Sequence, residues 1–218
     1  MNINELIGIT LLSLRVSGTA VAASATVGML LGALIASREF RGKNVAVTLV
    51  STLMGMPPVL LGLVLYLALS RSGPLGWTGL LFTPEAMILA QFLLTLPITT
   101  GLSISAIESL PRDTRETIYS LGANPLYELL LMLNEARAGL VGAVLTALGR
   151  AISEVGAVII VGGNIRYQTR VLTTAIVFYT NAGEFDAALA LGAVLASVYL
   201  VVNIVLVYMK LRVVSGGS

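Results

Sequence analysis

Two charged side chains interrupt a stretch of sequence that is otherwise apolar, and they are four residues apart. Between Ala138 and Ile165 the only charged residues are Arg150 and Glu154. Residues at this spacing share a face of a helix, and charge within an apolar helix normally faces a cavity or a partner. The pair therefore indicates one of two roles. Arg150 could bind an anionic solute while Glu154 masks it, or the two could form a structural ion pair with a neighbouring helix.

A second group of polar side chains surrounds Pro97. Its members are Thr95, Thr99, Thr100, Ser103 and Ser105. Hydroxyl groups near a proline kink can donate hydrogen bonds to an oxyanion in transit, but they can equally bond the carbonyl groups one turn earlier. We take Thr95, Pro97 and Thr99, together with Arg150 and Glu154, as candidates for the path or gate of a solute, with local bonding as the alternative.

Several kinds of chemistry are excluded by composition. The chain has no cysteine and no histidine, which rules out disulfides, Cys or His metal sites and imidazole catalysis. The phosphate-binding pattern GxxxxGK[ST] is absent, and the Gly162-Gly163 pair has neither the lysine nor a preceding strand. We therefore expect no nucleotide site, no cofactor and no enzymatic activity of the chain by itself.

The elements that carry these residues are predicted to be membrane-spanning helices. Of the 218 residues 56% are hydrophobic and only 11% are charged, less than half the usual share of about a quarter. Several uncharged runs exceed the length of about 20 residues that crosses a bilayer. We expect one all-α integral membrane domain over 1–218, in which a short interfacial helix within Met1–Leu14 precedes five spans. The expected spans are 11–37, 44–70, 84–108, 138–162 and 187–210, with kinks at Pro57-Pro58 and Pro97.

The lysines and arginines predict an orientation. Eight of them flank the spans on the side of the long polar segment 109–138 and the C-terminus, and four lie on the other side. This bias places that segment and the C-terminus in the cytoplasm and the N-terminus outside. Because the cations flank apolar spans, the basic pI of about 9.1 does not indicate a nucleic-acid partner.

The polar segment 109–138 predicts two short helices. The first would begin at Asp113 or Thr114 and end at Leu121, and the second would run from Leu126 to Asn134, after a break at Gly122, a cap at Asn124 and a proline in its first turn. The second helix would present one apolar face, made of Leu126, Leu129, Leu130 and Leu133. This pattern is typical of a unit that docks a soluble partner, with a hairpin on the lipid surface as the alternative.

This region resembles the "EAA" loop of permease subunits of ATP-binding-cassette importers. The triplet is Glu135-Ala136-Arg137, followed by Gly139. The continuation is similar to the oxyanion branch of this family. The segment GRAISEVGA from Gly149 resembles a segment of molybdate permeases, and GGNI from Gly162 and TRVLTTAI from Thr169 resemble tungstate permeases more closely.

The resemblance implies a five-span type I (MetI-like) transmembrane domain with a cytoplasmic coupling helix. It implies a homodimer over a pair of ATPase subunits in a bacterial or archaeal cytoplasmic membrane, supplied with tungstate, or next with molybdate, by an extracytoplasmic binding protein. The residues it implies for ATPase coupling are Ser120, Leu121, Gly122, Ala123, Asn124, Glu135, Ala136 and Gly139.

Three alternatives stay open at this stage. The importer could carry another oxyanion or small solute, or the chain could be a stand-alone secondary transporter, although no internal repeat is evident. In addition, the residues between the fourth span and the next helix could meet the binding protein or be merely solvated. Those residues are Asn164, Arg166, Gln168, Thr169 and Arg170.

Overall fold

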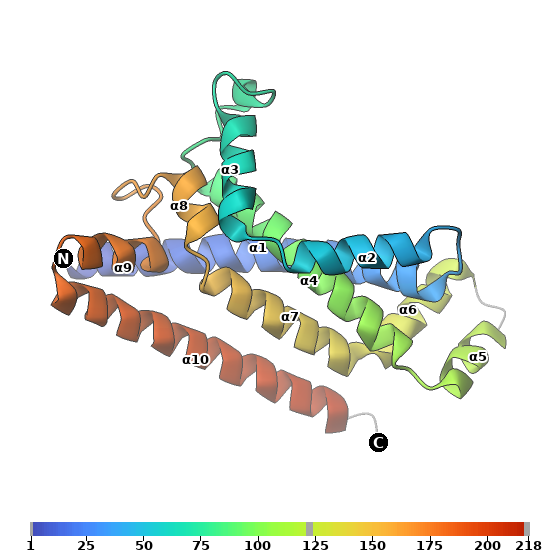
Figure 1. Cartoon of the computed structure of the whole chain (residues 1–218). Helices are drawn as coiled ribbons and strands as arrows, with labels where there is room; N and C mark the ends of the chain where they lie inside the picture. The colour runs from blue at the N-terminus through green and yellow to red at the C-terminus, as the bar shows by residue number, and fades with distance from the viewer. Residues whose placement is uncertain (1, 121–123, 216–218) are drawn as a thin grey trace.

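The computed structural model describes residues 2–120 and 124–215, and within these ranges every regular element is a helix. Four helices, α1, α4, α7 and α10, run side by side and form the body of the molecule (Figure 1). Their bounds are Ile3–Ser37, Pro84–Glu108, Arg137–Ile152 and Phe185–Ser215. The expected all-α architecture is confirmed.

Helix α1 is one unbroken helix of 35 residues, so the expected separate interfacial helix within Met1–Leu14 is wrong. The polar side chains of Thr10 and Ser13 do not break it, because each donates to the carbonyl oxygen one turn earlier, at 2.8 and 2.7 Å. At about 1.5 Å per residue α1 is roughly 52 Å long. It therefore extends well beyond a hydrocarbon layer of about 30 Å.

The second expected span is two helices that meet almost at a right angle. Helix α2 (Lys43–Met54) and helix α3 (Pro58–Leu69) are bent by 97° at the Gly55–Pro57 break. Pro57 and Pro58 have no N–H to continue α2, and Pro58 suits the first turn of a new helix. The two prolines thus end one helix and start another, where we expected only a kink. Helix α3 stands across the bundle, and a short 3₁₀ turn, η1 (Gly76–Thr78), follows it (Figure 1).

The fourth expected span is also broken. Helix α7 ends at Ile152, and a second helix, α8 (Gly156–Gly162), begins after three residues. Loop 163–171 then leads to α9 (Leu172–Asn181), a helix that the sequence analysis did not predict. Helix α9 lies beside the first turns of α1 and packs against α10 (Figure 1).

Two short helices stand at the opposite end of the bundle from the N-terminus (Figure 1). They are α5 (Arg112–Ser120) and α6 (Pro125–Glu135), and we call them the α5–α6 unit. Their bounds agree with the prediction to within two residues. The predicted apolar face of α6 is partly wrong. Leu129 and Met132 are buried, whereas Leu126 and Leu130 are exposed.

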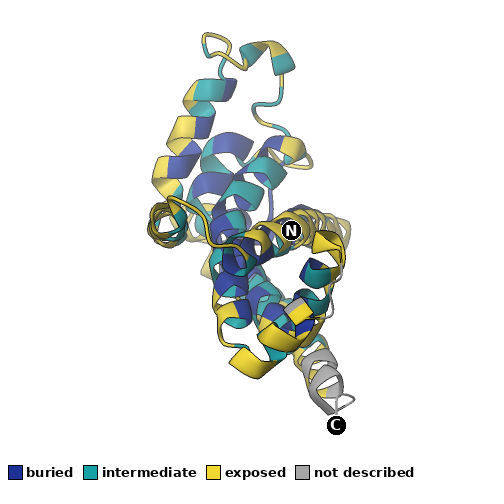
Figure 2. Cartoon of the chain, turned by 90° about the vertical axis from the view of Figure 1, so that its right-hand side faces the viewer, coloured by how far each residue is buried: buried dark blue, intermediate teal, exposed yellow. Residues whose placement is uncertain are grey.

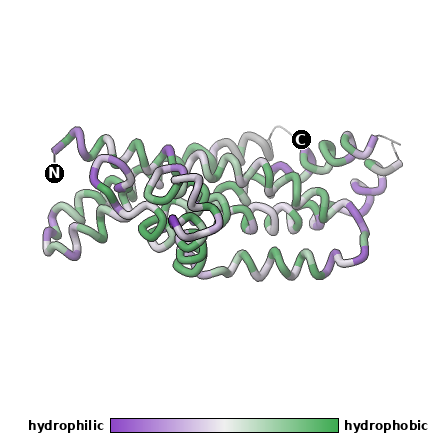
Figure 3. The backbone as a smooth tube through the Cα atoms, turned by 90° about the horizontal axis from the view of Figure 1, so that it is seen from above, coloured by the Kyte–Doolittle hydropathy of each residue, from purple (hydrophilic) through white to green (hydrophobic). Residues whose placement is uncertain are grey.

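The apolar surface fits a membrane protein. Three described helices, α1, α4 and α10, are long and apolar enough to cross a bilayer, and five segments are if the bent pairs α2–α3 and α6–α7 each count as one. Hydrophilic residues gather at the turns and towards the two ends of the molecule, with hydrophobic residues between them (Figure 3). Buried residues face the interior of the bundle while the outward faces are exposed (Figure 2).

The tightest seam of the core lies between α1 and α4. A Cβ atom at Gly28 would collide with Thr99 Oγ1, and one at Gly32 would lie 2.6 Å from Ser103 Cβ. The two glycines therefore let α4 approach the backbone of α1 closely, as small residues do in membrane bundles. This contact fixes the part of α4 that carries the candidate hydroxyl groups.

Candidate functional site

The break between α7 and α8 is held by side chains from other helices. Gln91 of α4 donates from Nε2 to the carbonyl oxygen of Ala151 at 3.0 Å, and Thr173 of α9 donates to the carbonyl oxygen of Glu154 at 2.9 Å. The Gln91 bond gives the Ala151 carbonyl oxygen a second partner beside the Glu154 N–H, and the Thr173 bond holds the backbone of the break itself. The sequence analysis considered neither Gln91 nor Thr173 for this role. The available signal was an amide side chain within an apolar span, where it needs a hydrogen-bond partner.

Arg150, in the last turn of α7, forms an ion pair with Glu154, which lies within the break. Their Nη2 and Oε2 atoms are 3.9 Å apart, and the side chain of Glu154 is only 4% exposed, against 38% for Arg150. The other carboxylate oxygen of Glu154, Oε1, accepts the Ala157 N–H at 3.0 Å in the first turn of α8. Glu154 thus both caps α8 and partly neutralises Arg150, whose side chain stays partly exposed.

Thr95 and Thr99 are fully buried in the seam between α4 and α1. Thr95 Oγ1 lies 2.8 Å from both Ser24 Oγ and the carbonyl oxygen of Gln91, and Thr99 Oγ1 lies 2.8 Å from the carbonyl oxygen of Ser24. Thr95 thus contacts the carbonyl group one turn earlier, as the local alternative predicts, while the contacts of both threonines with Ser24 of α1 are inter-helix contacts that neither interpretation included. Pro97 is buried between them, and α4 continues through it as one helix.

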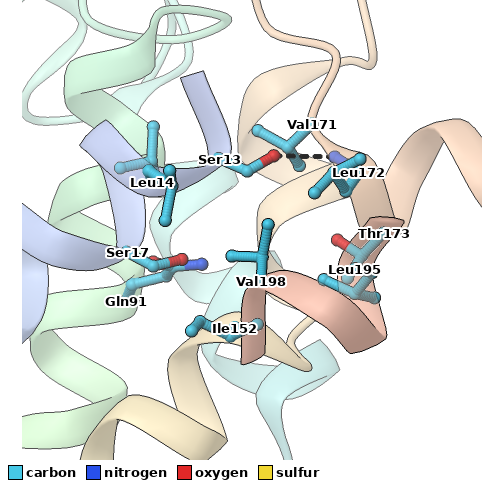
Figure 4. Close-up of a pocket in the computed structure, with 11 residues that line it drawn as sticks. Ser13, Leu14, Ser17, Gln91, Ile152, Val171, Leu172, Thr173, Leu195 and Val198 are labelled. Atoms are coloured by element: carbon cyan, nitrogen blue, oxygen red, sulfur yellow. Dashed lines mark hydrogen bonds between the residues drawn. The ribbon is translucent and has the colours of Figure 1, made fainter. Parts of the chain in front are cut away.

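A small cavity lies beside the break, between α1, α4, α7, α9 and α10. The polar side chains around it include Ser17, Gln91 and Thr173, and close to them the N–H of Leu172 donates to Ser13 Oγ at 2.8 Å (Figure 4). Its volume is about 20 Å³. A single water molecule needs roughly 10–15 Å³ of such space, so this cavity is too small for a tetrahedral oxyanion.

The α5–α6 unit is attached to the bundle mainly by apolar contacts. Ile118, Leu129 and Met132 pack against the ends of α1, α4 and α7 in one buried cluster. In addition, Arg115 Nη2 donates to the carbonyl oxygen of Ala36 at 3.4 Å. The unit is therefore joined to three bundle helices at once.

The predicted coupling residues flank and follow α6. The side-chain oxygen of Asn124 accepts the Leu126 N–H at 3.1 Å, which confirms the predicted cap. Glu135 is exposed and forms no ion pair with any residue that the structure describes. Ala136 is buried at the 73° bend between α6 and α7, and a Cβ atom at Gly139 would lie 2.6 Å from Ala106 Cβ of α4. Ser120 is exposed, and Leu121, Gly122 and Ala123 fall outside the described residues.

Loop 163–171 is far more ordered by polar contacts than a solvated connection would be. Thr169 is 1% exposed and Arg170 is 8% exposed, so the solvated alternative is wrong for both. The Thr169 hydroxyl donates to the carbonyl oxygen of Gly162 and accepts the Ile165 N–H. Hydrogen bonds to the Ile165 carbonyl oxygen, from the N–H groups of Gln168, Thr169 and Arg170, close the turn.

The first turn of α1 is tied to this loop by an ion pair. Arg166 donates from Nε and Nη2 to the two carboxylate oxygens of Glu5, at 2.8 and 2.7 Å. These hydrogen bonds raise the pKa of the Arg166 guanidinium above its ordinary value, so it stays charged. The sequence analysis assigned no role to Glu5. The missed signal was a lone acid in an apolar segment, which requires a cation as partner.

Comparison with known proteins gives one family match and several named relatives. Residues 28–215 match the family described as binding-protein-dependent transport system inner membrane component. The chain is 48% identical to a probable anion ABC transporter permease protein of Haloferax volcanii, over 93% of this chain and 90% of that protein. It is 42% identical to a tungstate uptake system permease protein of Peptoclostridium acidaminophilum, over 91% and 87%. A sulfate transport system permease protein of Escherichia coli is 31% identical over 81% and 65%.

Proposed function

Since the chain belongs to the family of binding-protein-dependent transport system inner membrane components, we propose that it is the permease of a tungstate importer. The importer would be driven by ATP hydrolysis in a separate pair of ATPase subunits. The similarity to a permease named for tungstate uptake supports the solute, and the relatives named for anions and sulfate support the wider oxyanion class. An extracytoplasmic binding protein would deliver the tungstate.

The observation that carries the coupling role is the α5–α6 unit. It projects from one end of the bundle and its buried cluster touches α1, α4 and α7. Glu135 is exposed where α6 turns into α7, and there it is available to a cation of an ATPase subunit. A movement of the ATPase would therefore reach three helices of the permease through one apolar contact.

This role implies an orientation and an assembly. The α5–α6 unit would lie in the cytoplasm and the N-terminus outside, in agreement with the excess of lysine and arginine beside the unit. Two copies of the permease would stand over two ATPase subunits in the cytoplasmic membrane. The outward apolar faces of α10 and α3 would contact lipid or the second copy.

Arg150 and Glu154 would form the gate on the solute path. The partly exposed Arg150 would bind the anion, while Glu154 would reduce its charge so that a dianion is not trapped. The position at a helix break supports this role, because a break is where two halves of a span can change their relative angle. Thr95, Pro97 and Thr99 would contribute by fixing α4 beside this break.

The importer is tested by reconstitution. The permease, the ATPase and the binding protein are placed in liposomes, and tungstate uptake and ATP hydrolysis are measured with and without the binding protein. We expect both to depend on the binding protein, and Glu135→Ala to reduce them several-fold while the permease stays folded. The matched control is Glu184→Ala, an exposed acid at the opposite end of the bundle.

Each result decides between the alternatives. Uptake that is insensitive to ATP would indicate a stand-alone secondary transporter. ATP-driven uptake of sulfate or molybdate with no tungstate uptake would retain the importer and change its solute. If Glu135→Ala behaved like Glu184→Ala, then the coupling role of Glu135 would be wrong.

The gate is tested with Glu154→Gln. The amide oxygen of glutamine can still accept the Ala157 N–H, so the cap on α8 is kept while the charge that faces Arg150 is lost. If the pair is a gate, then we expect tungstate uptake to fall with little change in thermal stability. A lower melting temperature with unchanged uptake per folded permease would instead identify a structural lock.

A further inference from the structure

A second cavity lies at the N-terminal end of the molecule, away from the helix break. It has a volume of about 280 Å³ and lies between the first turns of α1, the start of α4 and loop 163–171. Its charged lining residues are Glu5, Arg15 and Arg170. Arg38 follows the last residue of α1 and is expected on the opposite side of the membrane from Arg15. The two arginines are 23 residues apart, which is roughly 35 Å at about 1.5 Å per residue. The cavity thus lies at or beyond the boundary of a hydrocarbon layer of about 30 Å.

Arg170 is the most constrained cation of this cavity. Only 8% of the residue is exposed, and its guanidinium lies 4.2 Å from the centre of the Phe178 ring. Its hydrogen bonds go to one neutral residue, from Nε to Asn164 Oδ1 at 3.3 Å and from Nη2 to the Asn164 carbonyl oxygen at 3.5 Å. Among residues 2–120 and 124–215, no carboxylate forms an ion pair with it. Arg170 also attracts the nearby Glu5 carboxylate, but both oxygens of that carboxylate are hydrogen-bonded to Arg166, so a buried cation without an ion-pair partner of its own favours an anion as its next neighbour.

The other charges around the cavity leave an excess of positive charge. Both carboxylate oxygens of Glu5 are occupied by Arg166, and Arg15 Nη2 is 3.3 Å from Glu85 Oε1 at an exposed position. Three arginines therefore stand against two glutamates. Such an excess in a concave site raises the local concentration of anions.

The geometry points to a binding site for a small inorganic dianion of the tetrahedral oxyanion class. We propose that Arg170 holds the dianion from the inner side of the cavity and Arg15 from its rim, with Gln168 as a neutral donor. The site would capture the oxyanion on the outer face before it reaches the helix break, so the inference rests on the proposed function for its orientation and solute.

The loop that carries Arg170 is already held in place. Three N–H groups converge on the Ile165 carbonyl oxygen, and the buried Thr169 hydroxyl bridges Gly162 and Ile165. Little of the loop has to be ordered when an anion binds, so little affinity is lost to that cost. The depth of Arg170 favours a diffusing ion over an acidic side chain of a docking protein.

The test measures tungstate binding to the purified full-length chain, without ATPase or binding protein, by equilibrium dialysis and elemental analysis of tungsten. We expect saturable binding of tungstate, for which sulfate competes and chloride does not.

Arg170→Gln should weaken the affinity for tungstate about tenfold or more, because it removes hydrogen bonds between charged groups. Arg15→Gln should weaken it about threefold, since this side chain is exposed. Arg71→Gln, an exposed cation in the α3–η1 connection, is the matched control and should leave the affinity unchanged.

Any of three results would overturn the site: no saturable tungstate binding, equal loss in Arg71→Gln and Arg170→Gln, or unchanged affinity in the charge reversal Arg15→Glu. If Arg170→Gln fails to fold, then Arg15→Glu decides, because an exposed position tolerates the change. The proposed function is judged separately by ATP-driven uptake with the binding protein. If ATP-driven uptake is observed but the isolated permease does not bind tungstate, then this site is wrong and the proposed function stands. If the isolated permease binds tungstate but no ATP-driven uptake is observed, then the proposed importer function is wrong and the site stands.

Discussion

Loop 163–171, at the N-terminal end of the bundle, and the α5–α6 unit, at the other end, are held in place by different kinds of contact. At the N-terminal end, loop 163–171 is fixed by hydrogen bonds to Ile165 and Thr169 and by the ion pair between Glu5 and Arg166. At the other end, the α5–α6 unit is attached by a buried apolar cluster that includes Ile118 and Met132. Apolar side chains of α1, α9 and α10, such as Ile9 and Leu172, also pack together at the N-terminal end, but the loop itself is held by directional contacts, whereas the α5–α6 unit is held mainly by packing.

The difference matches what each end is proposed to do. Hydrogen bonds depend steeply on angle, so they hold a guanidinium at one place and orientation. Apolar packing is not directional, so a packed unit can shift as a body together with the helix ends it touches. A site that binds an ion needs the first property, and a unit that transmits movement from an ATPase needs the second.

The largest expected effect comes from opening the apolar cluster. Met132 is fully buried, and Met132→Ala should lower the free energy of unfolding by about 2–5 kcal/mol. Because this cluster joins the α5–α6 unit to the bundle, stimulation of an associated ATPase by the binding protein should fall as well. Both are measured on the same preparation, by chemical unfolding in detergent and by ATP hydrolysis.

The control for this experiment is Leu130→Ala on the same helix. Leu130 is 50% exposed, and its truncation should change stability by no more than about 0.5 kcal/mol. Equal losses in the two variants would show that the unit is not held by its buried face.

Much of the fold could be predicted, because its signals are local. Uncharged runs locate the long helices, and Asn124 with Pro125 locates the start of α6. The break between α7 and α8 could not be predicted in this way. The side chain that bonds the Ala151 carbonyl oxygen there belongs to Gln91, which is 60 residues away in the sequence. Likewise the sequence did not predict that α1 continues as one helix from Ile3. Its first turn contains the charged Glu5, and the cation that pairs with Glu5 is 161 residues away.

The candidate site shows the same limit. The spacing of Arg150 and Glu154 correctly indicated that they meet, but not that Glu154 lies beyond the end of α7 and caps α8. For Thr95 and Thr99 the pattern left two interpretations, and only the neighbouring Ser24 distinguishes their contacts. Long-range partners, not residue types, were the missing information.

A second prediction concerns the link between the α5–α6 unit and the bundle. In Gly139→Ala the new methyl group would meet Ala106 of α4, which forces α7 away and should cost roughly 1–3 kcal/mol. Gly192→Ala on α10 is the control, since a Cβ atom there has no heavy atom within 4 Å, and it should be neutral or slightly stabilising. Thermal unfolding measures both. If Gly139→Ala were as stable as Gly192→Ala, then α7 would not be in close contact with α4.

A third prediction concerns the polar end. Thr169→Val removes a buried hydroxyl that serves both Gly162 and Ile165, and unsatisfied buried groups cost about 1–3 kcal/mol. We expect the lower end of this range, because the Ile165 N–H is only partly buried. Hydrogen exchange of the loop amides measures the effect locally. Thr169→Ser keeps the hydroxyl and should protect these amides as the wild type does, and a serine variant as exchangeable as the valine variant would refute the role of the bond.

The last prediction concerns a difference between two variants, and it is the most selective, because it depends on which partner of one ion pair is removed. The Glu5 side chain is 2% exposed and that of Arg166 is 54% exposed. Arg166→Gln leaves a buried carboxylate without its two hydrogen bonds, whereas Glu5→Gln leaves a guanidinium that water can solvate. The melting temperature should therefore fall more in Arg166→Gln than in Glu5→Gln. Arg170, which also attracts the Glu5 carboxylate, limits the loss. Added salt should reduce the difference only slightly, because the carboxylate is shielded from solvent. The opposite order of melting temperatures would mean that Glu5 is solvated, and that its ion pair with Arg166 does not hold loop 163–171 to α1.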